Sequence, residues 1–206
     1  MVRSLVSVLR CEITPFFKPD IELTDSSPPD FYYLEGFDPM SMECYVDFFN
    51  FMAYDLHGPW EASDLGAFVR PQSSIIDIEN DLLPVWFDGL NASKINLGIP
   101  YYGRGYTLSN IYCTDVGCPY SGTSLPGPCT ESPGVLSLRE IKQIIKEKKL
   151  TPKLITNAMV KQITWDSQWF GYDDHDTMKM KMKWGDEHCL GGTAVWSIDF
   201  DSGAGR

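Results

Sequence analysis

Residues 46–60 read V-D-F-F-N-F-M-A-Y-D-L-H-G-P-W, a dense run of apolar and aromatic side chains that turns polar toward its end. A run of this kind is typical of a parallel strand buried on both faces, and we expect one over residues 46–54. Residues 94–100, K-I-N-L-G-I-P, and residues 192–200, G-T-A-V-W-S-I-D-F, have the same character. They predict two further buried strands, and a fourth strand is expected near residues 21–34.

Helices are expected between these strands. Residues 39–46 predict a short helix with a proline in its first turn, and residues 73–83 predict a longer helix that Pro84 ends or kinks. Ser137 and Glu140 have the spacing of a capping box, which predicts that a helix begins there. Residues 174–186 predict a further helix. Strands that alternate with helices favour an α/β fold with a parallel sheet.

The segment 105–134 differs from the rest because it is rich in Gly, Pro, Ser, Thr and Cys. It predicts a loop or the start of an inserted subdomain, and residues 160–165 and 169–172 beyond it predict a hairpin. Three cysteines fall in this segment, namely Cys113, Cys118 and Cys129. Disulfides are common in such loops of extracellular proteins. Since the cysteines are three, at least one needs a partner outside the loop, and the connectivity stays open.

Polar and aromatic side chains stand near the carboxyl ends of the three predicted strands. They are Tyr54 with Asp55, Tyr102 with Arg104, and Trp196 with Asp199. In a (β/α)8 barrel the active site is built from these strand ends. A full barrel takes about 250 residues, whereas this sequence has 206 residues and three good strand candidates. We therefore expect an incomplete (β/α)8 TIM barrel with an inserted α+β subdomain.

Composition excludes several classes of function. The formal charge is −11, and nucleic acids and anionic membrane surfaces both favour a basic partner, so we expect binding to neither. No apolar run approaches the roughly 18 residues of a membrane-spanning helix. The three histidines lie far apart without metal-ligand spacing, and we interpret them as structural or solvated: His57, His175 and His188. We expect no metal site and no cofactor.

The first nine residues, M-V-R-S-L-V-S-V-L, hold a short apolar stretch that two serines interrupt. A secretory signal needs about 7–15 apolar residues and a cleavage site, so this segment is not a convincing signal peptide. The cysteine-rich loop has the character of an extracellular protein. Together these observations suggest that the beginning of the protein is missing.

Several ordered stretches resemble the family 18 glycoside hydrolases, the chitinases. Residues 49–60, F-N-F-M-A-Y-D-L-H-G-P-W, are similar to the family's sixth-strand motif. Residues 97–106, L-G-I-P-Y-Y-G-R-G-Y, are similar to the seventh-strand motif. Residues 191–199, G-G-T-A-V-W-S-I-D, resemble the eighth strand, and residues 31–37, F-Y-Y-L-E-G-F, resemble the segment after the fifth. The resemblance implies a TIM barrel represented by strands about five to eight.

Residues 113–130 together with 162–174 resemble the inserted α+β subdomain of the fungal class V, killer-toxin-like branch of this family. The resemblance therefore divides the chain into four parts. They are a poorly matched segment (1–30), a barrel part with strands about five to seven (31–104), the inserted subdomain (105–175), and the last barrel helix and strand (176–206).

The family's mechanism departs from that of glycosidases with two catalytic carboxylates. A glutamic acid protonates the glycosidic oxygen, and the substrate's own N-acetyl carbonyl attacks the anomeric carbon. The resemblance implies that Tyr54 and Asp55 hold the acetamido group, with Met52 lining the same pocket. It also implies further substrate contacts: Trp196 as the floor under the −1 sugar, Trp60 stacked on the leaving-group side, and Tyr102 and Arg104 framing the cleft.

The family's acid motif, D-x-x-D-x-D-x-E at the end of the fourth strand, is absent from the sequence. We therefore expect a truncated chitinase-family protein that has the acetamido-binding residues but does not hydrolyse chitin alone. The alternative is a non-catalytic protein that binds chitin oligosaccharides. The expected partners are chitin or N-acetylglucosamine oligomers and, for a truncated protein, the missing N-terminal half of the barrel. The resemblance implies an extracellular location for the parent family.

Overall fold

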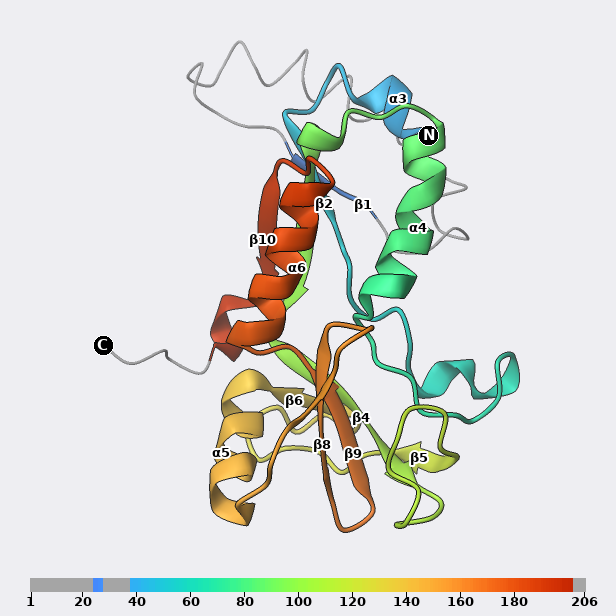
Figure 1. Cartoon of the computed structure of the whole chain (residues 1–206), viewed down its shortest axis with the longest axis vertical. Coiled ribbons are helices and arrows are strands. Elements are labelled where there is room, and N and C mark those ends of the chain that lie inside the picture. Colours follow the sequence, from blue (N-terminus) through green and yellow to red (C-terminus); the bar gives the residue numbers. More distant parts are fainter. Residues whose placement is uncertain (1–23, 28–37, 202–206) are drawn as a thin grey trace.

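The computed structural model describes residues 24–27 and 38–201, which form two sheets that follow one another along the long axis (Figure 1). The upper sheet is parallel and has the strand order β1-β2-β3-β10. Its strands are β1 (Thr24–Ser27), β2 (Phe48–Phe51), β3 (Ile95–Pro100) and β10 (Gly192–Trp196). The strands predicted over 46–54 and 94–100 are confirmed with shorter bounds, but β2 is fully buried on one face only, because Phe48 and Asn50 are partly exposed. β1 lies within the stretch where a fourth strand was expected.

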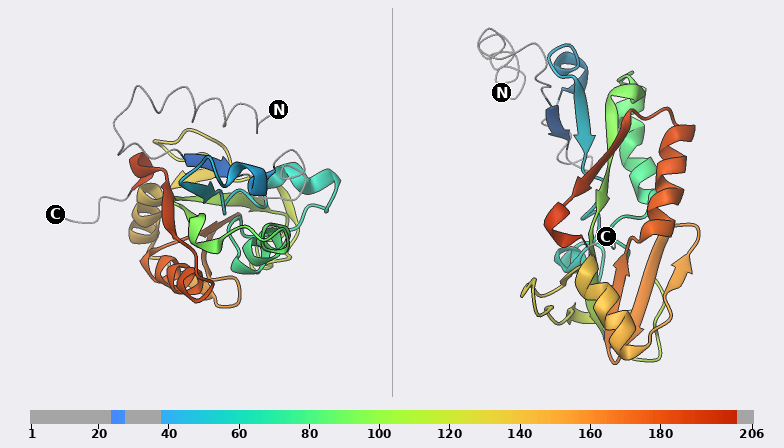
Figure 2. Two further views of the ribbon diagram at one scale, coloured as in Figure 1. Left: turned by 90° about the horizontal axis from the view of Figure 1, so that it is seen from above. Right: turned by 90° about the vertical axis from the view of Figure 1, so that its left-hand side faces the viewer.

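Two long helices cover one face of the parallel sheet, as the right-hand view of Figure 2 shows. They are α4 (Ile75–Phe87) and α6 (His175–Glu187). Because side chains alternate along a strand, Phe49 and Phe51 of β2 point to the same face and are both buried. They belong to one core cluster with residues of α4 and with Trp184 of α6. The helix predicted over 174–186 is confirmed.

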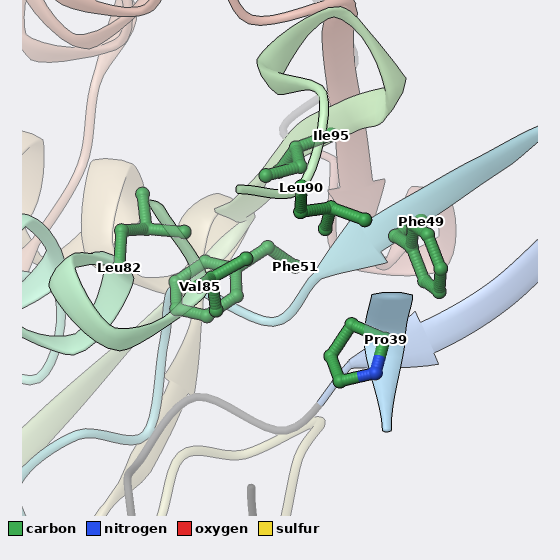
Figure 3. A pocket seen from close by; sticks show the side chains of 7 residues that line it. All are labelled: Pro39, Phe49, Phe51, Leu82, Val85, Leu90 and Ile95. Atoms are coloured by element: carbon green, nitrogen blue, oxygen red, sulfur yellow. The ribbon is translucent and has the colours of Figure 1, made fainter. Parts of the chain in front are cut away.

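The interface between α4 and the sheet is filled by apolar side chains (Figure 3). A cavity of about 10 Å³ remains there, and its lining consists of Pro39, Phe49, Phe51, Leu82, Val85, Leu90 and Ile95. A cavity this small with an apolar lining is expected to hold neither water nor a ligand. The helix-covered face is therefore core, and a binding site has to lie elsewhere.

Pro84 was expected to end or kink the second predicted helix, and the first of these alternatives, an end at residue 83, is wrong. α4 continues through Pro84 to Phe87. A proline removes one helical hydrogen bond, yet the last turn persists because the Asp88 N–H donates to the Pro84 carbonyl at 3.0 Å. Val85 is buried in the core beneath the sheet, and its packing offsets the lost bond. The helix expected over 39–46 is a single turn, α3 (Pro39–Met42).

The lower sheet is antiparallel, with the order β5-β4-β9-β8-β7 and with β6 paired to β4. Its strands are β4 (Tyr102–Leu108), β5 (Tyr120–Thr123), β6 (Val135–Ser137), β7 (Lys153–Ile155), β8 (Val160–Trp165) and β9 (Gln168–Tyr172). The predicted hairpin is thus β8 with β9. The predicted capping box opens α5 (Leu138–Lys148): the Glu140 N–H donates to Ser137 Oγ at 3.2 Å, and the Ser137 N–H donates to Glu140 Oε2 at 2.8 Å.

Of the two alternatives expected for the segment 105–134, a loop or the start of an inserted subdomain, the plain loop is wrong. The segment 105–134 is not a loop throughout, because most of β4 and all of β5 lie within it. Tyr102 and Arg104 stand just beyond the carboxyl end of β3, as expected, but they belong to a strand of the other sheet. β3 ends at Pro100, and the chain passes directly into β4, where these two residues pair with β6 and β9. The predicted strand also ends at residue 100, but the direct passage from it into a second sheet was not predicted.

The loop cysteines form one disulfide, between Cys113 and Cys118. Cys129 is free and exposed, so the expectation that a member of the trio pairs outside the loop is not met within the described residues. Cys118 and Cys113 pack against the core cluster around Tyr106 and Trp169. The disulfide therefore fixes the loop onto one face of the lower sheet.

The last predicted strand is shorter and more exposed than expected. β10 ends at Trp196 and is followed by a 3-10 turn, η3 (Ile198–Phe200). In the part of the chain that the structure describes, β10 pairs with β3 alone. As an edge strand it leaves the side chains of Val195 and Trp196 exposed by 46% and 57%. The apolar run correctly indicates a strand, but burial depends on neighbours that a single strand sequence does not specify.

Some predictions fall outside the described residues. These are the segment 1–23, Cys11, and residues 28–37 with the F-Y-Y-L-E-G-F stretch. Among the described helices, none has the length and hydropathy that crossing a membrane requires.

Candidate functional site

The Asp55 carboxylate joins the carboxyl end of the parallel sheet to the first strand of the antiparallel sheet. Its Oδ1 accepts hydrogen bonds from Tyr102 Oη and Arg104 Nε, each at 2.7 Å. Its Oδ2 accepts a third from Arg104 Nη2, also at 2.7 Å. A carboxylate has about four acceptor positions, so among the described residues Oδ2 keeps one without a donor. Because the Asp55 side chain is 37% exposed, that position is open to an incoming ligand.

The turn after β2 sets the direction of Tyr54 and Asp55. The Ala53 N–H donates to the Phe51 carbonyl at 2.9 Å, and the Tyr54 N–H donates to the Met52 carbonyl at 2.8 Å. Asp55 then adopts a left-handed backbone with φ of 59°, a conformation in which aspartate is enriched among non-glycine residues. This sharp change of direction turns the Asp55 side chain toward β4.

Gly98 in β3 makes room for the Tyr54 ring. A Cβ atom at Gly98 would lie 2.9 Å from Tyr54 Cε1 and 2.5 Å from the Phe51 carbonyl oxygen. Only a glycine allows the tyrosine to lie this close to the strand. The sequence analysis did not single out Gly98, although a glycine inside a predicted strand is the signal that could have found it.

Tyr54 offers a free phenol beside the carboxylate. Its hydroxyl makes no hydrogen bond to any part of the chain that the structure describes, and its ring packs edge-on against Tyr102 with centroids 6.2 Å apart. Burial and the charge of Asp55 both raise the pKa of Tyr54 above its ordinary value. The phenol is therefore a protonated hydrogen-bond donor at physiological pH.

Arg104 connects the carboxylate to Trp60. Its guanidinium carbon lies 5.0 Å from the Trp60 ring centroid and 5.8 Å from that of Tyr102, within the range of cation–π contact. Burial acts to lower the pKa of Arg104, but the hydrogen bonds and charge of Asp55 outweigh it and raise the pKa. Burial and the same carboxylate raise the pKa of Tyr102. Both side chains therefore stay protonated, and Trp60 is 52% exposed beside them.

Trp196 and Met52 complete the predicted set at the same edge of the sheet. The Trp196 carbonyl accepts from the Tyr101 N–H at 2.7 Å, which places the end of β10 next to the start of β4. The parallel register pairs Trp196 with Pro100. Met52 is partly buried directly after β2. The structure thus brings Asp55, Tyr102 and Arg104 into direct contact and places Tyr54 and Trp60 beside them. Met52 and Trp196 stand at the ends of their own strands at the same edge of the sheet.

A small cleft beside Tyr102 is lined by Asp199, which the sequence analysis placed at a strand end, and by residues to which it gave no binding role. It has a volume of about 210 Å³ and is lined by Cys129, Thr130, Ser137, Arg139, Asp199 and Phe200. The Phe200 ring packs edge-on against Tyr102 at 6.0 Å, so the cleft adjoins the Asp55 cluster. Its hydroxyl, guanidinium and carboxylate groups suit a polar ligand. Within the described residues, no group of three His, Cys, Asp or Glu side chains could hold a metal ion.

Comparison with known proteins extends this picture. The family model described as glycosyl hydrolases family 18 matches residues 3–201. The chain is 34% identical over 170 residues to human "Chitinase-3-like protein 2", and 35% identical over 165 residues to the "Endochitinase" of Brugia malayi. It is 28% identical over 200 residues to "Probable chitinase LysM18" of Penicillium expansum.

These alignments cover most of this chain but a minor part of the relatives. They include 78%, 75% and 88% of this chain, against 43%, 32% and 14% of the human, Brugia and Penicillium proteins. The chain therefore spans less than half the length of the curated relatives it matches.

Solved structures agree in fold. YKL-39, whose crystal structures were determined in the presence of chitooligosaccharides (GlcNAc4), superposes with a TM-score of 0.87 at 27% identity, over 98% of this chain and 57% of that one. A class V chitinase mutant from Cycas revoluta in complex with (GlcNAc)3 gives a TM-score of 0.82 at 27% identity, over 98% and 58%. With a family model that covers nearly every residue and with these relatives, the chain belongs to glycosyl hydrolase family 18.

Proposed function

We propose that the Asp55 cluster binds the acetamido group of N-acetylglucosamine oligomers, the repeating unit of chitin. The observation that carries this proposal is the fixed Asp55 carboxylate, held by Tyr102 and Arg104 with one acceptor position open and the free Tyr54 phenol alongside. An acetamido group has one carbonyl acceptor and one N–H donor. The phenol and the open carboxylate oxygen match these two groups in number and kind.

Aromatic side chains around the cluster support a carbohydrate ligand. Trp60 and Trp196 are both more than half exposed, and a large exposed indole is a favourable surface for the apolar face of a sugar ring. We assign Trp196 to the floor beneath the sugar whose acetamido group is bound, and Trp60 to the leaving-group side. Met52 lines the acetamido pocket, while Tyr102 and Arg104 hold Asp55 and frame the cleft.

The same geometry would stabilise charge during glycoside hydrolysis, but this chain does not supply a proton donor. A carboxylate and a phenol fixed at the acetamido group favour the positively charged ring that forms when the N-acetyl carbonyl attacks the anomeric carbon. Protonation of the glycosidic oxygen requires an acid, and the sequence holds no D-x-x-D-x-D-x-E motif. We therefore propose that these 206 residues bind chitin oligosaccharides without cleaving them.

Three finer assignments belong to this proposal. We infer that the chain forms the carboxyl-terminal part of a catalytic barrel, strands about five to eight, whose other half is its natural partner. We also assign it to the fungal class V branch, with the disulfide-bearing loop and the Penicillium relative as support. The disulfide also favours an extracellular location for the complete protein.

The proposal is tested by titrating the chain with tetra-N-acetylchitotetraose in a calorimeter. We expect saturable binding that Tyr54→Phe weakens about tenfold, because one hydrogen bond to the ligand is lost. Tyr112→Phe is the matched control, since Tyr112 is 90% exposed and lies in the loop of the lower sheet. Binding that both variants retain equally would overturn the acetamido site, and sugar release by the pure chain would overturn the absence of catalysis.

A further inference from the structure

The imidazole of His57 lies between two carboxylates from different elements. Glu61 belongs to the 3-10 helix η1 (Pro59–Ser63), and its Oε1 and Oε2 lie 2.9 Å and 3.1 Å from His57 Nδ1. His57 Nε2 is 3.4 Å from Asp77 Oδ2, in the first turn of α4. The His57 and Glu61 side chains are 17% and 14% exposed, so water screens their contact only in part.

Both ring nitrogens therefore face acceptors. Ionised carboxylates only accept hydrogen bonds, and a neutral imidazole has one N–H donor, whereas the imidazolium has two. Only the protonated ring satisfies both contacts, and loss of the proton leaves a lone pair facing a negative oxygen. We propose that His57 is a positioning residue, a protonation-dependent latch that fastens η1 to α4 and so holds Trp60 at the oligosaccharide site.

A continuous set of contacts leads from the latch to the site. Glu61 Oε2 accepts from the Gly58 N–H at 3.2 Å, and the Glu61 N–H donates to the Gly58 carbonyl at 3.1 Å. The Trp60 ring lies against Gly58 so closely that a Cβ there would be 2.1 Å from it. On the site side, Arg104 contacts Trp60 and binds Asp55. Without the His57 contacts η1 keeps these internal hydrogen bonds but loses its link to α4, and Trp60 moves with η1.

The two carboxylates around the latch favour a protonated ring, whereas the positive charge of Arg70 nearby acts against it. Glu61 and Asp77 face the ring directly. Arg70, from the loop before α4, lines a cleft of about 510 Å³ together with His57 and Asp77, and its charge acts on Asp77. Tyr106 of β4 and Tyr120 of β5 lie near enough to Glu61 for its charge to raise their pKa values further, after burial.

The balance of these groups favours the imidazolium. Burial acts to lower the pKa of His57, but the hydrogen bonds and charges of Asp77 and Glu61 outweigh it and raise the pKa above 6.5. A raised pKa means that the folded protein binds the proton more tightly than the unfolded chain. The latch is therefore complete below pH 6.5 and opens as the pH rises through the raised pKa.

A first test needs no sugar. In the full chain, the ring resonances of the three histidines are followed by NMR between about pH 5 and pH 9, and His57→Gln identifies the His57 signal. Trp60→Phe identifies the Trp60 indole N–H signal. We expect His57 to titrate above 6.5, Glu61→Gln to lower that midpoint, and the Trp60 signal to shift with the His57 midpoint.

The His57→Gln variant should abolish the pH dependence of the Trp60 signal, because glutamine does not titrate. His175→Gln is the matched control, since His175 is exposed at the start of α6. The latch is refuted if wild-type His57 titrates at or below 6.5, or if the Trp60 signal keeps the same pH dependence in His57→Gln.

A second test rests on the proposed function. Protonation of His57 closes the latch, so affinity for tetra-N-acetylchitotetraose should be about fivefold higher below the His57 pKa than above it. This factor is the low end of the coupling usually found between two linked sites. His57→Gln should remove this pH dependence and His175→Gln should keep it. Absence of binding at every pH, with Trp60 still following His57, would reject the proposed function and leave the latch standing. Binding with the same pH dependence in His57→Gln would reject the latch as a control of the site.

Discussion

Two aspartate–cation pairs in this molecule have the same contact distance but differ in how far their side chains are exposed to solvent. Asp55 and Arg104 meet at 2.7 Å at the rim of the parallel sheet, with side chains 37% and 20% exposed. Asp173 and Lys181 also meet at 2.7 Å, but their side chains are 0% and 1% exposed. Each carboxylate accepts three hydrogen bonds from the chain. Access to the remaining acceptor position therefore distinguishes a candidate binding group from a structural one, and contact distance does not.

The buried pair fastens the two halves of the chain together. Asp173 follows β9 of the lower sheet, and Lys181 lies in α6, which covers the upper sheet. Asp173 Oδ2 also accepts from Ser73 Oγ at 2.7 Å, just before α4, and its Oδ1 accepts from Thr177 Oγ1 at 2.8 Å. Burial lowers the pKa of Lys181, against the attraction of Asp173. The pair holds the lower sheet, α4 and α6 in one arrangement.

The largest effect is expected from breaking the buried pair. Lys181→Met keeps most of the apolar length of the side chain but leaves Asp173 as a buried charge without a cation. Removing one partner of a buried pair costs about 3–5 kcal/mol. Equilibrium unfolding in urea, followed by circular dichroism, should show a loss of this size in the free energy of unfolding.

An exposed pair provides the control for that experiment. Lys148 and Asp166 are 3.6 Å apart, with side chains 45% and 79% exposed. Lys148→Met should change the free energy of unfolding by about 0–1 kcal/mol. Adding Asp173→Asn to Lys181→Met should recover part of the loss, because it removes the unpaired charge. Equal losses in Lys181→Met and Lys148→Met would contradict a fastening role for the buried pair.

The sequence predicts the positions of helices and strands better than it predicts which other elements pack against them. The capping box of Ser137 and Glu140 placed α5 correctly because its signals are local and lie within four residues. Pro84 misled the prediction because a local penalty was outweighed by the core packing of Val85, which depends on the sheet. The exposure of Trp196 was missed for the same reason, since strand neighbours are not encoded in the strand itself.

The binding roles of the predicted site residues stay a prediction, and the sequence did not specify the contacts among these residues. Tyr54, Asp55 and Arg104 were identified by resemblance, whereas the bidentate contact between the last two depends on the direct passage from β3 into β4. The ion pairs of His57 were missed because Asp77 lies 20 positions along the chain, on the other side of an irregular loop. The buried pair of Asp173 with Lys181 carried no signal, because D-D-H-D and M-K-M-K both read as solvated surface.

An intermediate loss in the free energy of unfolding is expected at Gly98, where a strand of the core packs against Tyr54 of the Asp55 cluster. Gly98→Ala would place a methyl group 2.5 Å from the Phe51 carbonyl oxygen and 2.9 Å from the Tyr54 ring. Overpacking of this kind costs about 1–3 kcal/mol. It should also displace Tyr54, so affinity for chitotetraose should fall together with the free energy of unfolding.

Gly122→Ala is the matched control for Gly98→Ala. Gly122 also lies in a strand, β5, and a Cβ atom there meets nothing within 4 Å. We expect this variant to keep both stability and sugar affinity close to those of the wild type. If Gly98→Ala behaves like Gly122→Ala in both measurements, the close packing of Tyr54 over β3 does not matter for the site.

The smallest effect on stability, and the strongest contrast with Lys181, is expected from Asp55→Asn. Asparagine tolerates the left-handed backbone at this position and still accepts a hydrogen bond from Tyr102. Because Asp55 and Arg104 are partly exposed, loss of the charge should change the free energy of unfolding by less than about 1 kcal/mol. Affinity for chitotetraose should nevertheless fall about tenfold or more, since the open acceptor and the orientation of Arg104 both change. Urea unfolding and calorimetry on the same preparation measure the two quantities together. A large loss in the free energy of unfolding with unchanged affinity would contradict a ligand-binding role for Asp55. Asp55 would then stabilise the fold, as Asp173 does.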